Sequence, residues 1–90
     1  MINHALVYLE SKGLIYADPA YYIPHEINSY AGIVVDVADH NGVSISVAPS
    51  LAEYDRHVPP KITLNSSQED LLEPILDTLI FAIKHGKITS

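Results

Sequence analysis

The chain of 90 residues contains no cysteine, no tryptophan and only four glycines. Without cysteine, neither a disulfide nor a thiolate metal site can form. With so few glycines, a glycine-rich loop that cradles a phosphate is not expected. The five histidines show no metal-ligand spacing, and no nucleophile elbow occurs. We therefore expect no catalytic site, no metal and no cofactor.

Basic residues and long apolar runs are also scarce. Five lysines and arginines stand against 11 aspartates and glutamates, and the formal net charge is −6. Because binding to phosphate backbones normally uses a basic stripe, we expect no direct nucleic-acid contact, and an acidic surface favours a basic protein partner. The longest apolar stretch, residues 79–83, is too short to span a membrane, and residues 1–13 lack the basic start of a secretory signal. These features predict a cytoplasmic protein without membrane contact.

Hydrophobic residues make up 48% of the chain, which is enough for the core of one small domain over residues 1–90. Residues 3–12 have the apolar spacing of a helix, and residues 14–16 could add a short edge strand. Ser50 and Glu53 form a capping box that predicts a short helix. Residues 61–64 alternate like a strand, and residues 66–85 predict a long helix that is kinked or broken at Pro74.

Residues 33–48 predict a β-hairpin, because apolar residues alternate with small or polar ones on both sides of a turn. A two-residue loop at Asn41 and Gly42 would place the two apolar rows on opposite faces. A three-residue loop, His40 to Gly42, pairs Val37 with Ile45 and keeps both rows on one face, with Gly42 in the left-handed position. The second face is then small and semi-polar, open for docking, and consists of Val34, Asp36, Ala38, Ser44, Ser46 and Ala48.

The order of these elements predicts an α+β domain with two layers. We expect a mostly antiparallel sheet of three or four strands with two helices on one face, in the order α-(β)-β-β-short α-β-α. The order resembles, in topology only, the α-β-β-β-α arrangement of double-stranded-RNA-binding domains. The basic loop and helix end that this family uses for RNA are missing here, so the resemblance implies no RNA binding.

Tyrosines gather between residues 16 and 30, among polar and acidic residues. Rigid amphipathic rings beside adaptable polar groups are typical of protein-binding loops. The alternative is that each ring covers the edge of the core with its hydroxyl in water. Together with the second face of the hairpin, this segment predicts a partner-binding set of Tyr16, Asp18, Tyr21, Tyr22, Glu26, Tyr30, Asp36, Ser44 and Ser46.

The only phenylalanine, Phe81, falls on the polar side of the last predicted helix, near Pro74, Thr78 and His85. Two interpretations remain open. Another segment could cover Phe81, which would bury the helix on two sides. Alternatively, Phe81, Pro74, Thr78 and His85 form a self-association contact in a homodimer, or a contact with a partner.

These patterns favour a small acidic protein-binding module rather than an enzyme. An inhibitor, an adaptor, or an immunity-like or chaperone-like accessory protein of a bacterium or phage would have this size and charge. An alternative is an acidic nucleic-acid mimic that blocks a DNA- or RNA-binding protein, which requires carboxylates clustered on one face. A small metal-dependent or hydrolytic enzyme is the third alternative, although its motifs are missing.

Overall fold

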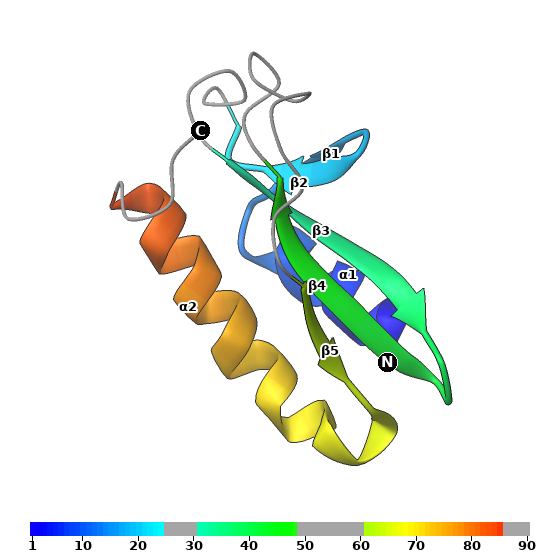
Figure 1. Ribbon diagram of the computed structural model, residues 1–90. Coiled ribbons are helices and arrows are strands. Elements are labelled where there is room, and N and C mark those ends of the chain that lie inside the picture. The colour runs from blue at the N-terminus through cyan, green and yellow to red at the C-terminus, as the bar shows by residue number, and fades with distance from the viewer. Residues whose placement is uncertain (25–30, 49–60, 86–90) are drawn as a thin grey trace.

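The fold is described from a computed structural model for residues 1–24, 31–48 and 61–85 (Figure 1). In these residues, five antiparallel strands form one sheet in the order β1-β2-β3-β4-β5. Helices α1 (Ile2–Ser11) and α2 (Leu72–Lys84) share one hydrophobic core with one face of this sheet. The predicted α+β class is confirmed, but the sheet has five strands rather than three or four.

The edge strand predicted at residues 14–16 is present as β1, and the additional strand, β2, comes from the tyrosine-rich segment, which the sequence did not assign to regular structure beyond residue 16. Strands β1 (Ile15–Ala17) and β2 (Ala20–Tyr22) form a hairpin across Asp18 and Pro19, whose peptide bond is cis. Proline has no backbone N–H to donate, so it suits the turn between two strands better than the interior of either one.

Strands β3 (Gly32–Ala38) and β4 (Gly42–Ala48) form the predicted hairpin, with both apolar rows on one face. The exact register differs from the prediction, because Val37 pairs with Val43 rather than with Ile45. The loop between the paired residues therefore runs from Asp39 to Asn41, one residue earlier than expected.

The left-handed positions of this loop belong to His40 and Asn41, with φ of 57° and 61°, and not to Gly42. The Gly42 N–H donates to the Asp39 carbonyl at 3.1 Å, which closes a turn with the twist that hairpins prefer. Gly42 is needed for another reason. A Cβ at this position would collide with the backbone oxygen of Leu64 in the neighbouring strand.

Strand β5 (Lys61–Leu64) pairs with β4 and leads into the 3-10 helix η2 (Ser66–Leu71) and then into α2. Asn65 caps η2, and its partner in the capping box is Gln68. Pro74 lies in the first turn of α2, where a missing N–H costs no helical hydrogen bond. The predicted break at Pro74 is wrong in position, because α2 already begins at Leu72 and the non-helical backbone lies at Gln68. The short helix predicted around Ser50 lies outside the described residues.

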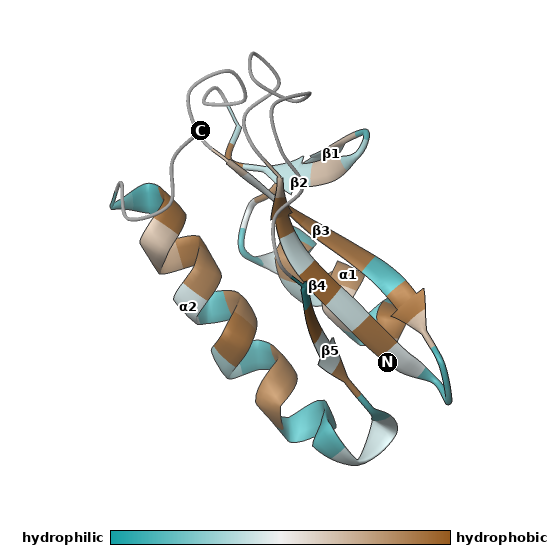
Figure 2. Ribbon diagram, in the orientation of Figure 1, coloured by the Kyte–Doolittle hydropathy of each residue, from teal (hydrophilic) through white to brown (hydrophobic). Residues whose placement is uncertain are grey.

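The core lies between the sheet and the two helices, and Figure 2 shows hydrophobic residues along the strands and α2. Leu71, just before α2, is 43% exposed, whereas the neighbouring Leu72 is fully buried in the core. The largest fully buried side chains of this core are Leu9, Ile33, Val43, Ile45, Leu72, Leu76 and Ile83.

Candidate protein-binding groove

Strand β3 is longer than its neighbour on the outer side. The pairing of β2 with β3 is registered at Tyr21 and Ile33, and β2 begins only at Ala20, just after the turn that joins it to β1. Ala20, the first residue of β2, lies opposite Val34, so from Val35 to Ala38 β3 has no strand beside it on this side within the described part of the chain. The free N–H and C=O groups of such an edge can pair with an added strand.

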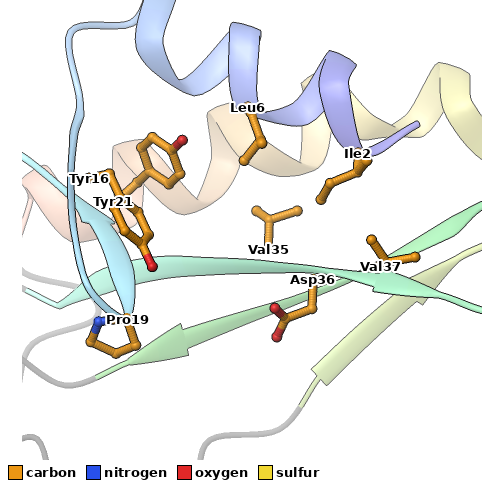
Figure 3. Close-up of a pocket in the computed structure, with 8 residues that line it drawn as sticks. All are labelled: Ile2, Leu6, Tyr16, Pro19, Tyr21, Val35, Asp36 and Val37. Atoms are coloured by element: carbon orange, nitrogen blue, oxygen red, sulfur yellow. The ribbon is translucent and has the colours of Figure 1, made fainter.

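A groove of about 330 Å³ follows this edge (Figure 3). Side chains from the first two turns of α1 point toward Val35 on the helix-covered face, whereas Asp36 points to the opposite face. Both faces of an added strand would thus find contacts, apolar on one side and acidic on the other. The groove is lined by Ile2, Leu6, Tyr16, Pro19, Tyr21, Val35, Asp36 and Val37.

Two tyrosines close one end of the groove. Their rings, from Tyr16 and Tyr21, lie 5.3 Å apart at 58°. The Tyr16 hydroxyl donates to Asp18 Oδ1 at 3.0 Å, and this bond raises the pKa of Tyr16. Burial raises the pKa of Tyr21, as does the nearby Glu10 carboxylate, whose Oε2 accepts from the Tyr21 hydroxyl at 3.5 Å. Both hydroxyls therefore stay protonated at neutral pH.

The structure brings together only part of the predicted partner-binding set. Tyr16, Asp18, Tyr21 and Asp36 lie at the groove or beside it. The assignment of Tyr22 to a binding surface is wrong, because its side chain is fully buried against Ala20 and Ala48. A strand alternates its side chains, so Tyr21 and Tyr22 face opposite sides of the sheet. Glu26 and Tyr30 lie outside the described residues.

The second face of the hairpin is less open than expected. Ser44 and Ser46 are only half-buried, but Ala48 is buried, and a Cβ at Gly32 would lie 2.7 Å from the Tyr22 ring. Tyr22 therefore covers one end of this face. Asp36, which was expected beside Ser46, pairs across the strands with Ser44.

A polar ladder between α1 and α2 was not anticipated from the sequence. His4 and Tyr8 on α1 and Lys12 just after it are spaced by four residues. Glu69 in η2 and Glu73 and Asp77 in α2 have the same spacing. The Tyr8 hydroxyl donates to Asp77 Oδ1 at 2.6 Å, and Lys12 Nζ lies 3.8 Å from the same atom. The four-residue spacing of each set is visible in the sequence. No neighbouring residue, however, indicates that the two sets lie against each other in the fold.

His4 forms the first rung of this ladder, because its Nδ1 lies 2.8 Å from Glu69 Oε2 and its Nε2 lies 2.8 Å from Glu73 Oε2. Only the imidazolium form carries a proton on both nitrogens, so both bonds at once require the charged ring. The hydrogen bond to Glu73, followed by that to Glu69, raises the pKa of His4 above 6.5. This rung holds α1, which forms one wall of the groove, against α2.

We predict that this rung makes stability depend on pH. The folded-state pKa is raised, so the contribution is fully present below pH 6.5 and is lost as the pH rises through the folded-state pKa. The melting temperature is expected to fall as the pH rises from about 6.5 through the folded-state pKa of His4, and His4→Gln is expected to flatten that part of the curve. Thermal unfolding across this range measures both. An unchanged slope in His4→Gln would contradict the assignment.

The remaining candidate residues lie apart from the groove. Phe81 is 59% exposed and stacks on His85, with ring centroids 4.1 Å apart, so the described structure does not bury it under another segment. Pro74 and Thr78 are exposed on the same helix, and the Thr78 hydroxyl donates to the Pro74 carbonyl at 2.9 Å.

Within the described ranges, no three histidine, cysteine or acidic side chains gather as metal ligands, and no helix is long and apolar enough to cross a membrane. Comparisons of the chain with family models, with curated proteins and with solved structures found no match. The groove, the two sheet edges and their charges are therefore the features from which a function is inferred.

Proposed function

We propose that the protein is a binding module that captures an extended segment of another protein along the free edge of β3. The observation that carries this proposal is the coincidence of an unpaired strand with a groove. β3 runs past β2 from Val35 onward, and the groove of about 330 Å³ lies along that same stretch. An inhibitor, adaptor or other accessory protein acting in the cytoplasm would fit this mode of binding.

The bound segment would add to the sheet as a further strand. Its main chain would bond to β3, which gives affinity, and its alternate side chains would occupy the two sides of the edge, which gives specificity. Side chains on the helix-covered side would meet Ile2, Leu6 and Val35, so apolar residues are favoured there. Side chains on the other side would approach Asp36.

Charge indicates a basic partner. Asp36 lines the groove, Asp18 is held beside Tyr16 at its end, and Glu10 accepts from Tyr21. No lysine, arginine or histidine is among the described residues that line it. With a net charge of −6 over the chain, electrostatic steering would speed the approach of a basic segment. The preferred segment would therefore alternate apolar residues with lysine or arginine.

We predict that selection from a displayed library of random twelve-residue peptides enriches this alternating pattern. Val37→Lys, at a residue that is 71% exposed on the edge, is expected to weaken the best peptide at least about tenfold, because lysine protects strand edges from pairing. Asp36→Lys is expected to weaken it similarly and to remove most of its salt dependence. Fluorescence anisotropy with the labelled peptide measures both changes.

The matched control is Ile62→Lys, which introduces the same charge on the opposite edge of the sheet and is expected to leave peptide affinity unchanged. Enrichment of peptides that bind Val37→Lys as tightly as the native chain would contradict the proposed site. Equal loss in the control would show a general effect of charge instead.

Nucleic-acid mimicry is a second candidate, which needs a row of free carboxylates. Glu69, Glu73 and Asp77 form such a row, with a rise of about 6 Å between successive members. Each of them, however, lies within hydrogen-bonding or ion-pair distance of His4, Tyr8 or Lys12 on α1. A partner would have to displace these contacts, so the edge of β3 offers the better binding surface.

A further inference from the structure

We propose that a second copy of this chain docks at the other edge of the sheet, along β5 and the outer face of α2. The first observation is a second groove, of about 240 Å³, between the edge strand and the helix. β5 is the last strand of the sheet, and α2 runs beside it in Figure 1. The groove is lined by Ile62, Leu71, Pro74, Ile75, Thr78 and Leu79, none of which is charged.

The second observation is the distribution of charge around α2. At about 100° per residue, Glu73, Asp77 and Lys84 fall within an arc of about 40°. Two of these residues are engaged with α1, through His4 for Glu73 and through Tyr8 and Lys12 for Asp77. The outer arc of α2, which is about 160° wide and faces neither the core nor α1, contains no aspartate, glutamate, lysine or arginine. A helix that is apolar nearly all round is normally buried.

The distribution of charge also indicates that the molecule bound in this groove is a second copy of the chain. In a two-fold symmetric contact, residues near the axis meet their own copies, so a charge there would face a like charge. A chain with 11 acidic and five basic residues repels its own copy over most of its surface. An uncharged groove is where two copies can approach, whereas a partner chosen by charge would gain nothing there. The groove at β3, with its carboxylates, has the opposite character.

Repulsion between like charges also favours one register of the two β5 strands. A two-fold axis perpendicular to the sheet places a residue of β5 opposite itself, with the helices of both copies on one side. Centring on Thr63 separates the two Lys61 residues by about 13 Å along the strands, whereas centring on Ile62 leaves about 7 Å, within the screening length at physiological salt. We therefore place Thr63 opposite Thr63 of the second copy, which pairs Ile62 with Leu64 across the interface.

The helix completes this contact. A stable dimer buries about 800 Å² per partner, about 15% of the 5289 Å² surface of this chain. A four-residue strand alone does not supply that area, so the outer face of α2 must take part. Phe81, with His85 stacked on it, continues this face beyond the groove. The exposed residues predicted for self-association therefore belong to the same surface as the free edge of β5.

Sedimentation equilibrium of the full chain between about 1 and 500 µM tests this contact. The native protein is expected to approach twice its mass of 9.9 kDa. Ile62→Lys and Thr78→Glu are each expected to raise the dissociation constant at least about thirtyfold. The matched control is Ile15→Lys, on the edge strand β1, because Ile15 is 44% exposed and Ile62 is 43% exposed. A native chain that stays monomeric, or equal weakening in all three variants, would overturn the proposal.

The absence of cysteine allows a direct test of the register. In the proposed dimer the two Thr63 Cα atoms lie about 5 Å apart, within the range that a disulfide spans. Thr63→Cys is expected to form a covalent dimer in a glutathione redox buffer, seen on a non-reducing gel, whereas Lys61→Cys is expected to stay monomeric. No covalent dimer from Thr63→Cys, or the same yield from both variants, would overturn the register.

Discussion

Gly42→Ala is expected to destabilise the protein by about 3 kcal/mol. The added methyl group would meet the backbone oxygen of Leu64, and its next contacts are the Asp39 carbonyl at 3.1 Å and the Asn65 Cα at 3.3 Å. All three atoms belong to the backbone, which cannot rotate away as a flexible side chain can. Urea unfolding measures the loss, which would be a large fraction of the stability typical of a chain of this length.

The control for this prediction lies in the same turn. Asn41 has φ of 61°, a conformation that glycine adopts without steric strain, so Asn41→Gly is expected to leave stability unchanged or slightly raised. If Gly42→Ala proves as harmless as Asn41→Gly, the close approach of β4 to the end of β5 is wrong. A large loss from Asn41→Gly would place the left-handed residues elsewhere.

Leu76→Ala is the second substitution with a large expected effect, a loss of about 3 kcal/mol. Leu76 is fully buried in the core that α2 shares with the sheet and α1, so the shorter side chain would leave a cavity as well as lose apolar burial. Denaturant unfolding at one fixed protein concentration measures the change, because a dimer would make stability depend on concentration.

Val7→Ala provides the comparison on a helix surface. Val7 is 66% exposed on α1, and its truncation is expected to change stability by less than about 0.5 kcal/mol. A cost below about 1 kcal/mol for Leu76→Ala would mean that α2 packs through another face. In that case the uncharged arc assigned to the dimer would be misplaced too, so this experiment also bears on the outer surface of the helix.

The two edges of the sheet differ in the chemistry that they offer. The edge at β3 combines an unpaired strand with Asp36 and with Asp18 nearby, which suits a basic segment of another protein. The edge at β5 combines a short strand with an uncharged helix face, which suits a second copy. Val37→Lys and Ile62→Lys therefore serve as controls for each other, since each is expected to affect one surface and leave the other intact.

If both proposals hold, dimerisation would leave the groove at β3 accessible in each of the two copies. The contact at β5 would join two five-stranded sheets, and β3 and the β1–β2 hairpin would stay at the far side of each copy. A dimer could then hold two extended segments at once, which strengthens binding to a partner that carries two of them.

The sequence by itself determined the local structure of the hairpin and of both helices. Alternation of apolar residues placed both rows of β3 and β4 on one face, because a shift by one residue would have exposed one row. The exact turn did not follow, because Gly42 suggested a left-handed residue where it serves close packing against Leu64. A steric need of this kind arises from a strand that is distant in sequence.

Only the tertiary structure decided which residues are accessible. Tyr21 and Tyr22 are both largely buried, at 8% and 0% exposed, yet they lie on opposite faces of the sheet and Tyr21 lines the groove. Leu71 and Leu72 also differ although they are adjacent, because one is 43% exposed and the other is fully buried. The ladder from His4 to Asp77 likewise required α1 to lie against α2. Periodicity describes one element at a time, whereas exposure and pairing depend on which elements lie beside it and where the sheet ends.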